Sequence, residues 1–248
     1  MFIDLHCHLD SLDEIDKVIA RARRKRVRTV LTVGVSVETN RKAIALAERF
    51  EEVKAAMGLY PSEAVKLSDD KVDKEIRFIQ ENVKNIIAIS EVGMDLKELD
   101  SLDRQSEIFS KFVELANELD KPIIVHSRKA EKECIEILEK LKARKVVMHC
   151  FSGNFKLVKR IVENKWHLTV PTCVKHSEHF QRVALDVPLD QLFCESDAPY
   201  LHPDKKFPNE PANVVTSYKI IARIKNLDIK AVESKIERNY KILFDGKS

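Results

Sequence analysis

The sequence has few glycines, no paired cysteines and no strong net charge, and each absence argues against a class of protein. Only five glycines occur in 248 residues and none forms a G-x-G-x-x-G motif, which argues against a dinucleotide-binding sheet. The five cysteines are scattered and include no C-x-x-C pair, so neither a structural zinc motif nor a redox motif is indicated. Unpaired cysteines in odd number favour reduced thiols and an intracellular protein.

Signals for membranes and secretion are also missing. No run of about eighteen apolar residues occurs, and Met1 leads directly into Phe2-Ile3-Asp4-Leu5 instead of a basic and then apolar leader. Lys and Arg number 43 against 40 Asp and Glu, so a net charge of +3 predicts no large basic surface for nucleic acid. We expect a cytoplasmic protein with no membrane contact and no obligate protein partner, in which local groups bind any polyanion.

Short apolar runs rich in Val and Ile alternate with segments of helical period along most of the chain. This is the pattern of successive βα units. The eight predicted strands are Phe2–Leu5, Thr29–Val35, Val53–Leu59, Ile86–Ile89, Pro122–Val125, Lys145–Met148, Trp166–Val170 and Gln191–Cys194.

Helical periodicity fills most of the intervals between these strands. The predicted helices lie around 15–22, 72–83, 103–119, 130–141, 155–165, 211–225 and 230–244, with a weaker pattern over 176–188. Strands that are apolar on both faces are typical of parallel sheets covered by helices. Eight βα units in a chain of this length predict one domain over residues 1–248, an α/β fold of the (β/α)8 TIM-barrel type.

Ligand-type side chains follow five of the predicted strands, at the end where such barrels carry their functional groups. His6 and His8 close the first strand, and two residues on alternate strand positions point to the same side. An H-x-H pair alone is a weak signal, because histidines near a strand end are often only hydrogen-bonded. The other four ligand-type residues are Glu91, His126, His149 and Asp197, each directly after or just beyond an apolar run.

Six such residues in matching positions are hard to explain as packing alone and predict a metal centre. Four imidazoles and two carboxylates suit divalent cations such as Zn²⁺, Mn²⁺ or Mg²⁺. We expect two cations, with Glu91 the natural bridging carboxylate because it lies on the central strand of the set.

Several strings in this sequence resemble those of TatD-type metal-dependent hydrolases, a family of the amidohydrolase superfamily. The resemblance spans nearly the whole chain, with its motifs in family order. The matching strings are Asp4-Leu5-His6-Cys7-His8-Leu9, Glu91-Val92-Gly93-Met94-Asp95, Pro122 to Arg128, His149-Cys150-Phe151-Ser152-Gly153, Glu195 to Leu201, Asn209-Glu210-Pro211, and Arg238-Asn239-Tyr240 with Leu243-Phe244.

The resemblance implies a metal-dependent deoxyribonuclease that removes nucleotides from the 3′ end of DNA, and the sequence leaves RNA open as another nucleic-acid substrate. It assigns His6, His8 and Asp197 to one metal, His126 and His149 to the second, and Glu91 to both. Bound cations lower the pKa of a water toward neutrality for attack on phosphorus, and Asp197 is expected to orient or deprotonate that water. Asp197 and Glu91 are therefore the expected catalytic residues.

Other positions of this sequence match the family less closely. Tyr60 and Ser62 stand where the family usually has histidine, and Tyr60 is expected either to contact substrate, as a hydrogen-bond donor or by stacking on a base, or to pack at the barrel rim. Leu96 and Pro208 replace an aromatic residue and an arginine that are common in the family. Arg128 matches a basic residue of the family and is expected to bind a phosphate, with a surface ion pair as the alternative.

Two other functions remain open from the sequence. One is hydrolysis of a carbonyl substrate, such as the ester of an aminoacyl-tRNA or a small amide, because the same metal chemistry attacks carbonyl groups. The other is a non-catalytic binding protein on the same barrel, which the intact set of six ligands disfavours. Bridging by a modified lysine, as in cyclic amidohydrolases, is disfavoured because the fourth strand ends in Glu91.

Overall fold

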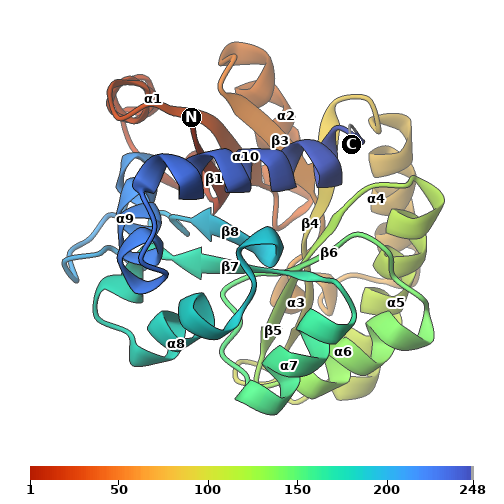
Figure 1. The fold of residues 1–248 in the computed structure, drawn as a ribbon. Coiled ribbons are helices and arrows are strands. Elements are labelled where there is room, and N and C mark those ends of the chain that lie inside the picture. The colour runs from red at the N-terminus through yellow and green to blue at the C-terminus, as the bar shows by residue number, and fades with distance from the viewer. Residues whose placement is uncertain (247–248) are drawn as a thin grey trace. The chain divides into compact units, whose positions relative to one another are not determined.

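The eight predicted strands are all present in the computed structural model, which describes residues 1–246. They form one sheet in chain order, β1 to β8, and alternate with helices along the chain (Figure 1). The prediction of a (β/α)8 barrel fold is confirmed. The strands are β1 (Phe2–Cys7), β2 (Val27–Val33), β3 (Val53–Met57), β4 (Ile86–Asp95), β5 (Ile123–Arg128), β6 (Val146–Met148), β7 (His167–Pro171) and β8 (Leu192–Glu195).

The α-helices include all those predicted, among them the weakly patterned one after β7. They are α1 (Ile15–Arg24), α2 (Val37–Arg49), α3 (Pro61–Ala64), α4 (Asp69–Glu81), α5 (Leu102–Glu118), α6 (Glu131–Lys140), α7 (Phe155–Glu163), α8 (Glu178–Asp186), α9 (Val215–Ile224) and α10 (Ile229–Phe244). Short 3-10 helices are η1 (Leu9–Ser11), η2 (Thr172–Lys175), η3 (Leu189–Gln191) and η4 (Pro211–Val214).

Two helices, α2 and α3, were not predicted. The side of α2 that turns inward carries Asn40, Ala43 and Leu46, and the first of these is polar although fully buried. The apolar period of the helix is therefore broken at one of its buried positions. Asn40 is accommodated because its side-chain amide pairs with the peptide of Gly58, donating to the carbonyl at 2.9 Å and accepting from the N–H at 3.1 Å.

The described chain divides into two compact units, each made of more than one segment. The first comprises residues 1–32, 46–54 and 167 onward, and the second comprises residues 33–45 and 55–166. The organisation of residues 1–248 as a single domain stays a prediction.

In the first unit, β1 pairs in parallel with β2, and β7 pairs in parallel with β8. All six residues of β1 are buried. Tyr218 of α9, also fully buried, holds the start of β1 because its hydroxyl accepts from the Ile3 N–H at 3.0 Å and donates to the Ile3 carbonyl at 3.1 Å. These two hydrogen bonds hold the start of the strand that carries His6 near its other end.

The second unit contains the parallel series β3, β4, β5 and β6. Helix α5 contributes the buried side chains of Ile108, Phe109 and Phe112 to the core of this unit. Strand β4 continues six residues beyond the predicted end at Ile89, since it stays paired with β5 as far as the partners Asp95 and Arg128. Polar residues of this strand are therefore held in the sheet itself.

Among residues 1–246, no helix combines the length and apolar character needed to cross a membrane.

Candidate metal centre

The first unit brings together three of the predicted ligands. His6 lies in β1, His8 follows it, and Asp197 lies just after β8, with their ligand atoms all within 4.8 Å of one another. The Asp197 Oδ1 is 3.7 Å from the His8 Nε2 and 4.0 Å from the His6 Nε2. His6 is fully buried, whereas His8 and Asp197 are slightly exposed, so the cluster is reached from one side.

Backbone and side-chain hydrogen bonds hold the end of β8 against β1. The Asp197 N–H donates to the His6 carbonyl at 2.9 Å, and the His8 N–H donates to the Ala198 carbonyl at 2.7 Å. Asp4 accepts from both the N–H and the hydroxyl of Ser196, each at 2.6 Å. Burial raises the pKa of Asp4 well above its usual value, although the bonds from Ser196 oppose the shift. These hydrogen bonds between β1 and the residues after β8 hold Asp197 beside the imidazoles of His6 and His8.

A buried asparagine closes the same end of the unit. The Asn209 amide donates to the Ser196 carbonyl at 2.7 Å and to the Thr172 hydroxyl at 3.0 Å. Its Oδ1 accepts from the Glu210 N–H at 2.9 Å. Asn209 belongs to one of the sequence strings that match the family. Its hydrogen bonds hold the segment that carries Asp197 in position.

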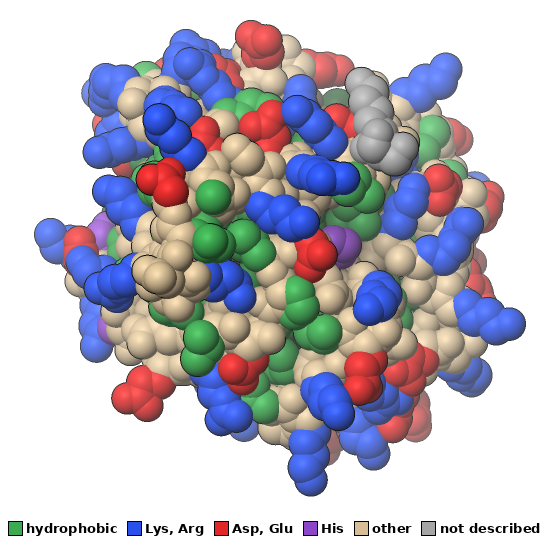
Figure 2. Space-filling view, viewed as in Figure 1, with side chains coloured by type: hydrophobic (Ala, Val, Ile, Leu, Met, Phe, Trp, Pro, Cys, Tyr) green, Lys and Arg blue, Asp and Glu red, His purple; other side chains and the backbone are tan. Residues whose placement is uncertain are grey.

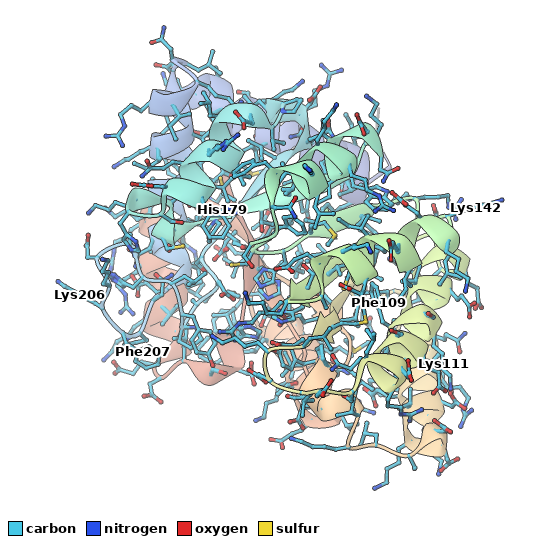
Figure 3. The ribbon with its side chains drawn as sticks, turned by 90° about the horizontal axis from the view of Figure 1, so that it is seen from below. Phe109, Lys111, Lys142, His179, Lys206 and Phe207 are labelled. Atoms are coloured by element: carbon cyan, nitrogen blue, oxygen red, sulfur yellow. The ribbon has the colours of Figure 1, made fainter. Side chains whose placement is uncertain are left out.

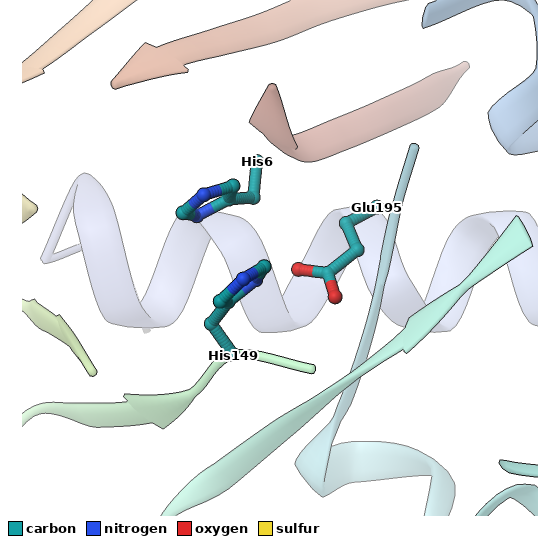
Figure 4. Close-up of side chains that lie close together, drawn as sticks. All are labelled: His6, His149 and Glu195. Atoms are coloured by element: carbon teal, nitrogen blue, oxygen red, sulfur yellow. The ribbon is translucent and has the colours of Figure 1, made fainter. Parts of the chain in front are cut away.

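Glu195, the last residue of β8, is a possible ligand that the sequence did not single out. It is fully buried, and its carboxylate lies within 4.8 Å of a His6 ring nitrogen. Figure 4 shows the His6 and Glu195 side chains at close quarters. The signal in the sequence is a carboxylate two residues before Asp197, at the end of an apolar strand.

The second unit brings together the other three predicted ligands. Glu91 lies in β4, His126 in β5, and His149 directly follows β6. The Glu91 Oε1 is 3.0 Å from the His126 Nδ1 and 3.9 Å from the His149 Nε2. Glu91 and His149 are buried, and His126 is slightly exposed.

Asp95, at the end of β4, binds the other nitrogen of His126. Its Oδ2 is 3.0 Å from the His126 Nε2 and accepts from the Tyr60 hydroxyl at 2.9 Å. Its Oδ1 accepts from the N–H groups of Lys97 and Glu98 at 2.9 and 3.0 Å. A carboxylate on one ring nitrogen fixes the tautomer and directs the lone pair of the other nitrogen toward a metal. Asp95 therefore leaves Nδ1 as the ligand atom of His126.

The pKa shifts of Asp95, His126 and Tyr60 follow from their burial and from the hydrogen bonds and charges around them. Burial by itself raises the pKa of Asp95, but the hydrogen bonds from His126, Tyr60 and Glu98 outweigh it and lower the pKa. Burial disfavours the imidazolium of His126, yet the bonds to Asp95 and Glu91 prevail and raise its pKa. Burial, with the nearby charges of Glu91 and Asp95, raises the pKa of Tyr60, which stays protonated as a donor.

Two glycines let the backbone approach these ligands closely. A Cβ on Gly93 would lie 1.9 Å from the His126 carbonyl oxygen, and its φ of +140° is rare for other residues. A Cβ on Gly58 would lie 2.9 Å from the Glu91 nitrogen and 2.6 Å from a Val92 methyl carbon. Glycine is therefore the residue that fits at each of these two positions.

The predicted substrate contacts lie in the second unit. Arg128, the last residue of β5, is partly exposed, with its nearest carboxylate, that of Glu98, at 3.8 Å. Tyr60 directs its hydroxyl to Asp95. Phosphate binding by Arg128 and substrate contact by Tyr60 stay predictions. No metal-type cluster among residues 1–246 includes a cysteine, or any of His167, His176, His179 and His202.

The residues of both clusters fit a divalent cation. Each cluster offers two imidazoles and a carboxylate, the donor set of zinc, manganese and related ions. A cation with bonds of about 2.1 Å in tetrahedral geometry places its ligand atoms about 3.4 Å apart. The separations of 3.7 and 4.0 Å in one cluster, and of 3.0 and 3.9 Å in the other, require shifts of only a few tenths of an ångström.

A barrel of βα units with histidine and carboxylate clusters at its strand ends defines the class of metal-dependent hydrolases. The family model described as TatD related DNase matches residues 3–245, and the chain belongs to this family. It is 35% identical over 241 residues to an uncharacterized metal-dependent hydrolase of Methanocaldococcus jannaschii, a match that covers 96% of this chain and 94% of the relative.

Two further similarities cover nearly the whole chain. The human deoxyribonuclease TATDN3 is 27% identical over 257 residues, with 98% of this chain and 94% of that protein covered. The crystal structure of YjjV, a TatD homologue from Escherichia coli, superposes with a TM-score of 0.91 at 25% identity and covers 98% of both chains. The predicted family is confirmed.

Proposed function

We propose that this protein is a two-metal deoxyribonuclease that removes nucleotides from the 3′ end of DNA. The observation that carries the proposal is the division of the six predicted ligands into two complete clusters, each with two imidazoles and one carboxylate. His6, His8 and Asp197 would hold one cation. Glu91, His126 and His149 would hold the other, and bridging by Glu91 stays a prediction from its place on the central strand of the set and from the family resemblance.

Divalent cations at such ligands supply Lewis-acid stabilisation of the phosphate oxygens and a water of lowered pKa. The side chain of Asp197 is 13% exposed, which leaves its carboxylate accessible from solvent to orient that water and accept its proton. Glu91 is almost fully buried and acts as a ligand. Asp95 and Ser196 act through these ligands by holding their orientation.

The choice of DNA rests on the relatives. The matching family model is described as a DNase, and the similar human protein is named a deoxyribonuclease. A phosphodiester substrate also fits the partly exposed Arg128, whose guanidinium can bind a phosphate through two hydrogen bonds. Digestion from the 3′ end and the identity of the cations, Mg²⁺, Mn²⁺ or Zn²⁺, are parts of the proposal carried over from the family resemblance and the donor set.

The test uses metal-loaded protein and single-stranded DNA labelled at either end. Release of a labelled mononucleotide from the 3′ end, with a ladder of shortened products from the 5′-labelled strand, is the expected result. Glu91→Gln and Asp197→Asn should each reduce the rate by about a hundredfold or more, as should a chelator. The exposed carboxylates Glu81 and Asp13 provide matched controls, because Glu81→Gln and Asp13→Asn change the same groups outside both clusters.

Three outcomes would contradict the proposal. Equal cleavage by the Glu91 and Asp197 variants would show that these residues do not carry the reaction. Release of label from the 5′ end first would reverse the polarity. Absence of cleavage by fully loaded protein would favour the carbonyl-substrate alternative, which is then tested with the ester of an aminoacyl-tRNA.

A further inference from the structure

Helix α4 carries a buried carboxylate, Glu75, that belongs to neither metal cluster. On the face drawn in Figure 2, Asp and Glu side chains lie at the surface among Lys and Arg, where charged side chains usually lie. Glu75 differs from them because only 2% of it is exposed. Burial of a carboxylate costs free energy unless the group is paired and hydrogen-bonded. Specific partners must therefore hold Glu75 in place.

Two donors from helix α2 bind the Glu75 carboxylate. The Asn40 Nδ2 donates to the Glu75 Oε1 at 2.7 Å, and the Arg41 guanidinium forms an ion pair with the same oxygen. The guanidinium carbon of Arg41 also lies 3.6 Å from the ring centroid of Phe78, on the next turn of α4. The charge of Glu75 is thus compensated, and its oxygen remains an acceptor for Asn40.

Helix α4 is itself held by contacts that do not involve Asn40. Its side chains Val72 and Ile79 are fully buried. An ion pair of 3.0 Å joins Asp73 of α4 to Lys111 of α5, which is labelled in Figure 3. Glu75 therefore presents its oxygen to Asn40 from a fixed helix.

Asn40 connects Glu75 to the backbone of two glycines. Its amide nitrogen has two donor positions, one for the Glu75 carboxylate and one for the Gly58 carbonyl, while its oxygen accepts from the Gly58 N–H. A Cβ on Gly34 would lie 2.0 Å from the Asn40 Oδ1, so Gly34 lies directly against the same amide. Because a carboxylate accepts hydrogen bonds, Glu75 fixes which end of the amide turns toward each partner.

The same two glycines contact the peptide that carries the metal ligand Glu91. The Glu91 N–H donates to the Gly34 carbonyl at 2.9 Å. A Cβ on Gly58 would lie 2.8 Å from the Ser90 carbonyl carbon and 2.9 Å from the Glu91 nitrogen. A shift of either glycine therefore moves the backbone of the ligand.

We propose that Glu75 and Asn40 are positioning residues for Glu91. Glu75 orients the amide of Asn40, and this amide fixes the two glycines against which the Glu91 peptide lies. Functional groups must be held within about 0.5 Å of their productive geometry, so a loosened backbone weakens the whole cluster. The proposal rests on the metal site of the proposed function and does not depend on DNA as the substrate.

The affinity for Zn²⁺ is measured by competition with a chromogenic chelator, in proteins that keep one cluster. His8→Ala removes a ligand of the first cluster, so the remaining cation is that of the Glu91 cluster. In this protein Glu75→Met should weaken Zn²⁺ binding about tenfold, because an apolar side chain of similar length cannot accept from Asn40. Glu75→Gln keeps the accepting oxygen and should restore the affinity.

Two controls separate positioning from a general loss of stability. In His149→Ala protein, which keeps the other cluster, Glu75→Met should leave Zn²⁺ affinity unchanged. Glu139 of α6 is a matched site in the same unit, because its carboxylate also accepts from an arginine and an asparagine, Arg160 and Asn164, each at 2.7 Å. Glu139→Met should lower the unfolding temperature and leave the Zn²⁺ affinity of both clusters unchanged.

Co²⁺ provides a second readout, because its visible absorption depends on the geometry of its ligands. In Co²⁺-loaded His8→Ala protein, Glu75→Met should shift the visible bands and Glu75→Gln should not. Asn40→Ala should weaken Zn²⁺ binding at least as much as Glu75→Met. Combining these two changes should weaken it no further, because both remove the same link.

The positioning role is overturned by an unchanged Zn²⁺ affinity in Glu75→Met, by equal losses at both clusters, or by an equal loss in Glu139→Met. Failure of the proposed function gives a different result. If Glu75→Met weakens the Glu91 cluster alone, but the fully loaded intact protein leaves DNA uncleaved, the deoxyribonuclease activity is refuted and the positioning role is supported.

Discussion

The carboxylate of Asp95 lies 3.0 Å from Nε2 of His126, on the side of the ring opposite the 3.0 Å contact between Nδ1 and Glu91. This relationship makes Asp95 the residue that decides which nitrogen of His126 faces the cluster. Tyr60 and two backbone N–H groups hold the carboxylate in turn. The orientation of one ligand therefore depends on the whole end of β4.

Asp95→Asn should weaken metal binding at the Glu91, His126 and His149 cluster by about 10- to 100-fold. The amide keeps the shape of the carboxylate but removes its charge and no longer fixes the histidine tautomer. Metal affinity is measured by competition with a chromogenic chelator. Asp103→Asn changes an exposed carboxylate of α5 and is the control. Unchanged affinity in Asp95→Asn would show that the His126 orientation is set elsewhere.

Metal content should follow the division into two clusters. Purified and dialysed protein is expected to hold two equivalents, and His8→Ala and His149→Ala are each expected to lose one, as measured by elemental analysis. Loading should also raise the unfolding temperature, because ligands that bind only the folded state stabilise it. His176→Ala, at an exposed histidine outside the clusters, should retain both equivalents. One equivalent in the intact protein, lost in either variant, would indicate one shared site.

Gly93→Ala should lower the free energy of unfolding by about 2–4 kcal/mol, through backbone strain and a clash with the His126 carbonyl. Urea unfolding monitored by circular dichroism measures the change. Gly246→Ala is the matched control, since that glycine also has a positive φ but nothing lies within 4 Å of an added Cβ. Its expected effect is about 1 kcal/mol or less. Equal effects at the two positions would mean that the close approach to His126 is unimportant.

The stabilisation provided by Glu52 should depend on pH. Its carboxylate accepts from the Arg23 guanidinium at 2.6 and 3.0 Å, and this bond lowers the pKa of Glu52 in the folded state. A lowered pKa means that the stabilisation is fully present above the unfolded value of about 4.3 and is lost as pH falls through the folded value. Glu52→Gln should thus destabilise the protein at neutral pH and progressively less in acid.

Urea unfolding of both proteins at several pH values tests this dependence. Glu51→Gln changes the exposed neighbouring carboxylate and should have little effect at any pH. Added salt should reduce the Glu52 effect, because Arg23 is half exposed and its charge is screened. A difference between Glu52→Gln and the unaltered protein that grows as pH falls would contradict the proposed ion pair.

The strands were predictable because their signal is local. Each is a short, mainly apolar and mainly buried run, so neighbouring residues in the sequence are enough to identify it. The six predicted ligands were found in the same way, since each follows such a run. Helix α2 was missed because its buried side includes the polar Asn40, whose partner Gly58 lies far along the chain in the loop after β3.

The sequence by itself determined the barrel class, the family and the identity of six ligand-type residues, because these depend on patterns along the chain. The family resemblance had already divided these residues between two metals, and only the tertiary structure placed Asp95 against His126 and Glu195 near His6. It also left Phe207 exposed. These relationships depend on which side chains of different strands and loops lie close together. Strand register and burial determine those contacts.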